Sequence, residues 1–150
     1  MTVPLKVDLT GKTAAITGGG GVLCGKMAEA LGECGAKVAV LDLREGASAE
    51  VAKRIVENGG LARSYACDVL DADSLRNVGQ QIVTDLGEVD ILVNGAGGNH
   101  PKGTTTKEFL FPDDLKNASD DLVTFYDLDP AGIQFVFNLN FLGTLLPTQA

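Results

Sequence analysis

A turn almost free of side chains stands between the first apolar segment of the chain and a stretch with helical spacing. Its residues run Thr17-Gly18-Gly19-Gly20-Gly21-Val22-Leu23-Cys24-Gly25. A glycine backbone lets a phosphate approach closely, and the free amides and positive dipole end of a following helix stabilise its negative charge. A strand, glycines, a helix and a later acid in this order predict that the turn holds the diphosphate of a dinucleotide.

The later acid is Asp42, which follows the second apolar segment, 24 residues after Gly18. In dinucleotide-binding units a carboxylate about 20 residues beyond the glycines accepts hydrogen bonds from the adenosine ribose and repels a 2′-phosphate. Asp42 therefore favours NAD over NADP, although the guanidinium of the neighbouring Arg44 would pair with such a phosphate. The alternative explanation of Asp42 is an acid of a solvated loop.

Further candidates follow the third and fourth apolar segments. Asp68 is placed to accept a hydrogen bond from the adenine amino group, and a turn-forming or capping role explains it about as well. Asn94-Gly95-Ala96-Gly97 offers small residues for the ribose and nicotinamide, at the crevice where doubly wound sheets bind ligands. Just beyond, Asn99, His100 and Lys102 are candidate substrate contacts, since a lysine suits a carboxylate. An exposed polar turn explains these three equally well.

Glycines mark the ends of the helices that must position these residues. Three expected helices stop at Gly35, Gly59 and Gly87, because glycine adopts the left-handed conformation after a helix without steric cost. Between the strands, apolar residues recur at three- and four-residue spacing, so each helix has one buried face. The expected strands are 14–17, 38–41, 62–67 and 90–93.

This alternation predicts an α/β fold, a doubly wound parallel sheet of Rossmann type with strand order 3-2-1-4. Residues 1–150 are expected to form one nucleotide-binding domain. Ser48 and Asp71 are the expected N-caps of the second and third helices. In the predicted order the fourth strand is an open edge, which invites pairing with another chain.

The regular pattern ends after the fourth strand. Residues 98–129 show no clean period and are expected to form a long insertion loop, either functional or simply long. Asp129 and Pro130 then fit the N-cap and first turn of a helix over 130–148, which is apolar round most of its circumference. Since such a helix is covered on both sides, we expect it to form an interface and the chain to be a homo-oligomer.

Composition and charge exclude several classes of protein. The 150 residues, 45% of them hydrophobic, suit one domain, and a net charge of −8 argues against binding nucleic acid or an anionic membrane. No apolar run is long enough for a membrane span or a secretory signal, so we expect a cytoplasmic protein. Cys24, Cys34 and Cys67 show no C-x-x-C pairing, which predicts reduced cysteines and no metal site.

Taken together, these motifs resemble those of the short-chain dehydrogenase/reductase family. The resemblance rests on Thr17-Gly18 with its glycine-rich continuation, Asp42, Asp68-Val69, Asn94-Gly95-Ala96-Gly97 and Asn140-Phe141-Leu142-Gly143. It covers the amino-terminal part of that fold, without the last strands, and is similar to the branch of D-mannonate oxidoreductases and gluconate dehydrogenases. The resemblance implies an NAD-dependent oxidoreductase that interconverts an alcohol and a ketone, with a sugar acid such as mannonate or fructuronate as substrate.

The resemblance also implies roles for individual residues. The diphosphate would lie on Gly18, Gly20, Gly21, Val22 and Leu23, the adenosine ribose on Asp42 with Leu43 beside it, the adenine on Asp68 and Val69, and the nicotinamide half on Asn94, Gly95, Ala96 and Gly97. Asn140 corresponds to the helix asparagine that supports a water-linked proton relay in this family. A mid-helix amide bonded to a neighbour is the alternative for Asn140, because buried amides need partners in any case.

The sequence departs from the family pattern in the cofactor motifs. Val22 and Cys24 stand where glycines are usual, and Gly95 stands where the family has a second asparagine. Cys24 would crowd the helix against the strand unless a small shift accommodates the sulfur.

The family's catalytic serine and Tyr-x-x-x-Lys pair are not among the 150 residues, and neither Tyr65 nor Tyr126 has a lysine four positions later. The chain alone would lack the general acid and is expected to be inactive. A non-catalytic nucleotide-binding or assembly module is therefore the alternative. A third candidate, an S-adenosylmethionine methyltransferase, also uses a glycine turn and a strand acid, but Asn94-Gly95-Ala96-Gly97 and Asn140 argue against it.

Overall fold

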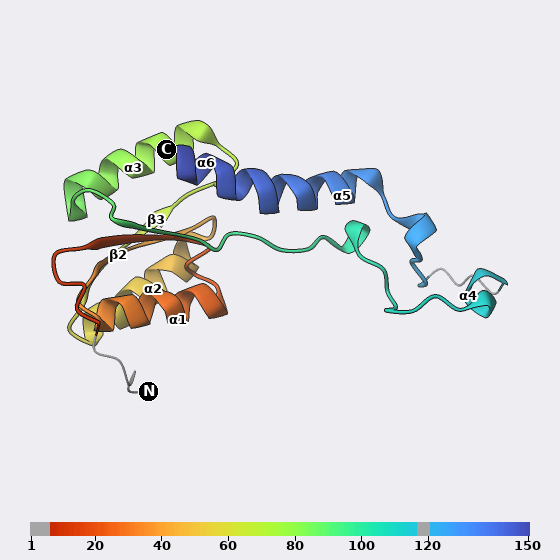
Figure 1. The fold of residues 1–150 in the computed structure, drawn as a ribbon, viewed down its shortest axis with the longest axis horizontal. Helices are drawn as coiled ribbons and strands as arrows, with labels where there is room; N and C mark the ends of the chain where they lie inside the picture. The colour runs from red at the N-terminus through yellow and green to blue at the C-terminus, as the bar shows by residue number, and fades with distance from the viewer. Residues whose placement is uncertain (1–6, 117–120) are drawn as a thin grey trace.

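A parallel four-stranded sheet lies between helices in the computed structural model, which describes residues 7–116 and 121–150 (Figure 1). The strands are β1 (Thr13–Thr17), β2 (Lys37–Asp42), β3 (Leu61–Ala66) and β4 (Ile91–Asn94). Their order is β3-β2-β1-β4, and each neighbouring pair is parallel. The α/β fold and the strand order are confirmed, and each strand limit falls within one residue of its expected place.

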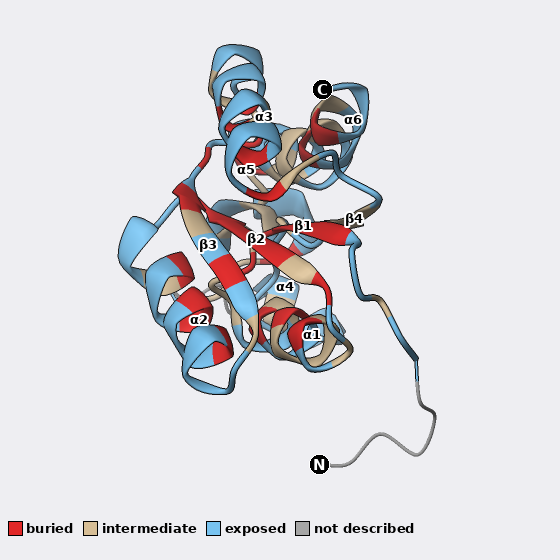
Figure 2. Ribbon diagram, turned by 90° about the vertical axis from the view of Figure 1, so that its left-hand side faces the viewer, coloured by how far each residue is buried: buried red, intermediate tan, exposed pale blue. Residues whose placement is uncertain are grey.

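Helices cover both faces of this sheet. α1 (Val22–Glu33) and α2 (Glu45–Glu57) lie on one face, and α3 (Ala72–Leu86) and α6 (Gly143–Gln149) lie on the other (Figures 1 and 2). Figure 2 shows that burial is concentrated in the strands and in the helix sides that face them. The sheet is therefore the middle layer of three.

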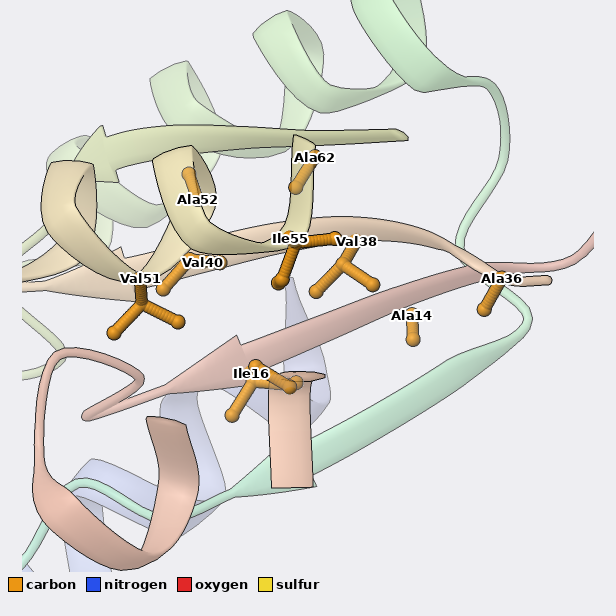
Figure 3. Close-up of a cluster of buried hydrophobic side chains, with 10 residues drawn as sticks. Ala14, Ile16, Ala36, Val38, Val40, Val51, Ala52, Ile55 and Ala62 are labelled. Atoms are coloured by element: carbon orange, nitrogen blue, oxygen red, sulfur yellow. The ribbon is translucent and has the colours of Figure 1, made fainter. Parts of the chain in front are cut away.

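Alternating side chains of the strands build one core on each face. Ile16 and Val40 pack with Ile55 of α2 on the first face (Figure 3). Leu41, the next residue of β2, points the other way and packs with Ile82 of α3. Burial of each such aliphatic side chain stabilises the fold by about 1.5–3 kcal/mol. The two cores hold the strands side by side, so that their carboxyl ends share one edge.

The glycines predicted to end helices have the expected backbone conformation. Gly35, Gly59 and Gly87, which follow α1, α2 and α3, have φ values of 92°, 85° and 99°. A side chain is strained in this left-handed region, so glycine is the residue that closes each helix there.

The expected N-cap of α3 is confirmed. The carboxylate of Asp71 accepts hydrogen bonds from the amides of Asp73 (2.8 Å) and Ser74 (3.2 Å). These two amides belong to the first turn, where the helix itself offers no acceptor. Asp71 thus fixes where α3 begins.

The expected N-cap of α2 is wrong. Ser48 lies inside α2, fully buried, and its hydroxyl donates to the carbonyl oxygen of Glu45 at 2.9 Å. The helix begins at Glu45, with Arg44 in the N-cap position. It starts there because the Asp42 carboxylate accepts the amide of Arg44 at 2.9 Å and turns the chain directly after β2. A contact of the candidate site therefore decides where α2 starts.

After β4 the chain leaves the sheet and returns (Figure 1). This segment contains two 3-10 turns, η1 (Pro101–Gly103) and η2 (Phe125–Asp127), and the short helix α4 (Pro112–Lys116). Its two arms meet where the amide of Thr106 donates to the carbonyl of Val123 at 3.1 Å. The part of the expected loop at residues 117–120 lies outside the described residues.

A long helical run leads back along the sheet. It consists of α5 (Pro130–Phe137), the π-helix η3 (Asn138–Leu142) and α6. Asp129 is the N-cap, as expected, and accepts the amide of Ala131 at 2.9 Å. The run ends at Gln149, one residue beyond the expected end at 148, and the sequence pattern does not foresee the π-helical turn. Within the described residues, no helix combines the length and the apolar composition needed to cross a membrane.

The cap of α3 can be tested by replacing Asp71 with alanine. Because two first-turn amides lose their acceptor, we expect the free energy of unfolding to fall by about 1 kcal/mol. Asp73→Ala is the matched control, since it removes the same charge from the same turn but breaks only an exposed ion pair with Arg76. It should cost less than about 0.5 kcal/mol. Urea denaturation of both variants measures the difference, and equal losses would contradict the assignment.

Candidate functional site

A cleft of about 490 Å³ opens where the carboxyl ends of the four strands meet. Parallel strands bring the residues that follow them to this one edge, although the residues are far apart in sequence. The predicted cofactor residues that line the cleft are Gly18, Gly21, Val22, Leu23, Asp42, Leu43, Asp68, Val69, Gly95, Ala96 and Gly97. Cys24, Arg44, Cys67 and Leu139 also line it and are not among the predicted contacts.

The glycine turn brings bare backbone and free amides to the cleft. Gly18 has φ +63°, and a Cβ on it would lie 2.8 Å from the carbonyl oxygen of Gly95. Val22 and Leu23 open α1, so their amides have no acceptor within the helix. Both residues line the cleft, and the helix dipole adds partial positive charge there. This end of the cleft can bind an anion.

Asp42 is held rigidly in the cleft wall. It is only 8% exposed, its Oδ2 accepts the amide of Gly20 at 3.1 Å, and its Oδ1 accepts the amide of Arg44 at 2.9 Å. The Arg44 Nε lies 3.4 Å from the same Oδ1. A carboxylate offers about four lone-pair sites, so Asp42 can still accept from a ligand hydroxyl.

Gly20 acts through Asp42 and does not itself line the cleft. A Cβ on Gly20 would lie 2.6 Å from the Cβ of Ala47 and 2.9 Å from Asp42 Oδ2. Both separations are too short for a side chain, so any larger residue would displace the turn or the carboxylate. The Gly20 amide is used by its bond to Asp42, and a contact of Gly20 with a diphosphate stays a prediction.

The end of β3 combines a turn with a cleft wall. Asp68 Oδ1 accepts the amide of Leu70 at 2.9 Å, and the Asp68 amide donates to Ser74 Oγ at 3.2 Å. Asp68 therefore forms the turn and lines the cleft at the same time. Burial raises the pKa of the neighbouring Cys67 thiol, so Cys67 stays protonated near neutral pH and contributes apolar surface.

The end of β4 is fastened to β1 by one hydroxyl. Thr17 is fully buried, and its Oγ1 accepts the amides of Gly95 at 3.1 Å and Ala96 at 3.2 Å. Asn94 points elsewhere: its Nδ2 donates to Thr148 Oγ1 of α6 at 3.1 Å, and Asn94 does not line the cleft. Asn94 thus ties β4 to α6, whereas Gly95, Ala96 and Gly97 form the cleft floor.

Asn140 clamps the backbone that continues from this floor. Its Oδ1 accepts the amide of Gly98 at 3.1 Å, and its Nδ2 donates to the carbonyls of Gly98 and Val136, both at 2.8 Å. A Cβ on Gly97 would lie 2.7 Å from Asn140 Oδ1. Both donor hydrogens of the amide are therefore used by the backbone, as in a helix amide bonded to its neighbours. A relay role for Asn140 stays a prediction.

The three candidate substrate residues do not line the cleft. His100 Nδ1 accepts the amide of Lys102 at 3.2 Å, and the His100 ring lies 5.0 Å from that of Phe135. Lys102 Nζ lies 3.4 Å from Asp129 Oδ2. The amide of Ala131, followed by Lys102, holds the pKa of Asp129 below its ordinary value. His100 and Lys102 therefore fasten the segment that leaves β4 to the start of α5, and Asn99 is exposed beside them.

A larger hollow of about 790 Å³ lies between α3 and α6, lined by residues such as Leu75, Val83 and Pro147. The start of α1 and the Asp42 carboxylate lie in the smaller cleft, so that cleft is the candidate site for the predicted nucleotide. Among residues 7–116 and 121–150, no group of three His, Cys, Asp or Glu side chains is arranged to hold a metal ion.

The clamp predicts a local effect of Asn140→Ala. The Gly98 amide loses its acceptor, and the loss of about 1 kcal/mol of hydrogen bonding should speed its hydrogen exchange roughly fivefold. Asn138→Ala is the control, because Asn138 Oδ1 bonds only Gln134 Nε2 of the same helix, at 2.7 Å. Hydrogen exchange measured by NMR tests this. An unchanged exchange rate of the Gly98 amide would show that its hydrogen bond to Asn140 does not stabilise the segment.

The chain is similar to known oxidoreductases along almost its full length. An uncharacterized oxidoreductase of Haemophilus influenzae is 48% identical over 149 residues, which are 99% of this chain and 51% of that protein. A crystal structure from the same species, provisionally named a D-mannonate oxidoreductase and solved with bound NAD, has a TM-score of 0.88 at 48% identity. The matched part is 95% of this chain and 50% of the Haemophilus influenzae chain.

A third similar structure bears on the cofactor. A metagenomic short-chain oxidoreductase solved with NADP has a TM-score of 0.74 at 25% identity, over 95% of this chain and 55% of that chain. Similar proteins thus bind either cofactor, and the chain spans about half the length of the relatives it matches.

The family match covers the same elements that build the cleft. A family model for short chain dehydrogenases matches residues 12–150, from the start of β1 to the end of α6. The strand order and the glycine turn agree with that match, and the chain belongs to the short-chain dehydrogenase family of oxidoreductases.

Proposed function

We propose that the chain forms the cofactor-binding half of an NAD-dependent dehydrogenase that interconverts an alcohol and a ketone. The observation that carries this proposal is the Asp42 carboxylate, held in one cleft with the free amides of Val22 and Leu23. When bound, a nicotinamide cofactor supplies or accepts the hydride. The chain itself binds the diphosphate at the start of α1 and accepts hydrogen bonds from the adenosine ribose at Asp42.

The glycines of the cleft fit such a cofactor because a side chain on any of them would push apart the segments that form the cleft floor. Gly18, Gly95 and Gly97 back onto neighbouring atoms so closely that a Cβ at each would approach within 3.0 Å of another residue. The floor of the cleft is therefore backbone, on which a ribose and a flat ring can lie. Asp68 and Val69 are the proposed adenine contacts at the other end.

We propose NAD in preference to NADP. The Asp42 carboxylate would repel a 2′-phosphate, since two negative groups in a partly buried wall are weakly screened. The exposed guanidinium of Arg44, which also lines the cleft, can pair with that phosphate and keeps the preference moderate. The bound NAD of the Haemophilus influenzae structure supports this preference for NAD.

We propose a polyhydroxylated sugar acid as substrate, a class that includes mannonate. The name of the Haemophilus influenzae neighbour supports this class. Lys102 would pair with the substrate carboxylate by exchanging it for Asp129, and Asn99 and His100 would lie beside it. Asn140, at the end of the cleft floor, would support the proton relay. The catalytic serine and the Tyr-x-x-x-Lys pair expected from the family are not among these 150 residues.

Cofactor binding is tested by titrating the chain with NADH and NADPH and following nicotinamide fluorescence. Asp42→Asn should weaken NADH binding roughly tenfold or more, because the ribose loses a charged acceptor. It should weaken NADPH binding less, because the charge that opposes the 2′-phosphate is gone. Glu45→Gln is the control, since it removes the same charge from an exposed residue outside the cleft. No binding of NADH at millimolar concentration would refute the proposed function.

We also propose that the chain self-associates through the helical run of α5, η3 and α6. Phe137 and Phe141 are 67% and 66% exposed on it, and no charged residue occurs from 130 to 150. Burial of such apolar surface stabilises association by about 25 cal/mol per Å².

Sedimentation tests this self-association. The wild-type chain should sediment with a mass that rises with concentration, and a Phe137→Ser/Phe141→Ser variant should remain a monomer. Phe111→Ser, which changes a phenylalanine that is 59% exposed directly before α4, should behave as wild type. A monomeric wild-type chain at high concentration would exclude the interface.

A further inference from the structure

The thiol of Cys24 occupies the space that a side chain at position 95 would need. A Cβ built on Gly95 would overlap Cys24 Sγ and would lie 2.9 Å from the carbonyl oxygen of Thr17 and 3.5 Å from Cys24 Cβ. Real Cβ atoms do not approach other heavy atoms within 3.0 Å. Positions 24 and 95 therefore share one volume, and both line the nucleotide cleft.

Residue 95 has no freedom to yield to this contact. The Thr17 hydroxyl accepts the amides of both Gly95 and Ala96 from the buried end of β1. The glycine turn packs on the same segment: a Cβ on Gly18 would lie 2.8 Å from the Gly95 oxygen and 2.9 Å from the Ala96 Cα. The backbone at 95–96 is thus fixed to β1.

The helix that carries Cys24 has little room as well. Glycines of α1 face α2 so closely that a Cβ on Gly25 would lie 3.2 Å from Val51 and one on Gly32 would lie 2.7 Å from Ile55. With α1 packed on α2, the contact between Cys24 and Gly95 bears directly on the first turn of α1. That turn carries the amides of Val22 and Leu23, one and two residues before Cys24.

We infer that Cys24 is a positioning residue, whose thiol rests on the bare Cα of Gly95 and sets the distance between the first turn of α1 and the cleft floor. This inference rests on the proposed function, because that distance matters only if a nucleotide spans the two. Positions 24 and 95 then act as one unit: added volume at 95 pushes the amides away from the floor, and removal of the thiol relieves the push. The thiol needs no chemical reactivity for this role.

A double-mutant cycle tests the unit. Gly95→Ala should weaken NADH binding about tenfold in the Cys24 background, as expected for overpacking of a fixed contact. In the Cys24→Ala background the new Cβ has only the 3.5 Å contact with the Cβ of residue 24 and the 2.9 Å contact with Thr17 O. The loss of NADH affinity should then be clearly smaller than in the Cys24 background, and the 2.9 Å contact with Thr17 O accounts for the loss that remains. Cys24→Ser/Gly95→Ala, with an oxygen smaller than sulfur at position 24, should lose an amount of NADH affinity between those of Gly95→Ala in the two backgrounds.

The matched controls are Gly46→Ala and Cys34→Ala. Among the described residues, a Cβ on Gly46 meets no atom within 4 Å, and Cys34 ends α1 away from the cleft. These two substitutions should leave NADH binding unchanged and should combine additively. Melting temperatures of all variants separate loss of folding from loss of binding.

The outcomes are distinguishable. An equal loss of NADH affinity from Gly95→Ala in both backgrounds would contradict the claim that positions 24 and 95 share one volume. A lowered melting temperature with full NADH affinity in folded Gly95→Ala would overturn the positioning role. If Gly95→Ala does not fold, recovery of folding and binding in Cys24→Ala/Gly95→Ala supports the inference, and failure of the double variant overturns it. If the wild type binds no NADH, the proposed function fails and this inference with it, whereas the melting temperatures still decide whether the two positions are coupled.

Discussion

The hydrogen bond from the Gly20 amide to the Asp42 carboxylate joins the two halves of the site. It connects the turn after β1 to the end of β2, at 3.1 Å. The other oxygen of the carboxylate accepts the Arg44 amide and starts α2. One side chain therefore orients the glycine turn, aims its own lone pairs into the cleft and fixes the next helix. Gly20 has no room for a Cβ. The bond therefore depends on a glycine at position 20.

The cleft is shaped by bare backbone in close contact with fixed neighbours. Gly18 lies against the carbonyl of Gly95, and Gly97 lies against the side-chain amide of Asn140. The first contact is a strong constraint because main chain cannot rotate out of the way, and the second because the Asn140 amide is held by its hydrogen bonds to backbone. Thr17 and Asn140 supply the hydrogen bonds that hold these segments at the required distance. A bare floor with fixed edges is the arrangement that a flat, polar ligand needs.

Local sequence patterns predict the helices and strands well. The features that they do not predict depend on contacts between segments far apart in the sequence. Alternating apolar residues and the glycine at the end of each helix lie within one element, so the strands were placed to within a residue. Ser48 was assigned wrongly because Asp42, outside the helix, decides where α2 begins. The direct lining residues were largely foreseen from motif order. The contact of Cys24 with Gly95 and the clamp of Asn140 on Gly98 join residues far apart in sequence, and no local periodicity reports them.

A net charge of −8 repels an anionic ligand at long range, but most of this charge is too far from the cleft to matter. At physiological ionic strength exposed charges farther away than about 8 Å are largely screened, so most of the acidic residues contribute little inside the cleft. The charges that count are those in contact with it. The start of α1 adds partial positive charge there, and Asp42 is partly compensated by two amides and Arg44. The proposed binding mode, with a diphosphate at one end of the cleft and neutral ribose hydroxyls at Asp42, agrees with this distribution of charge.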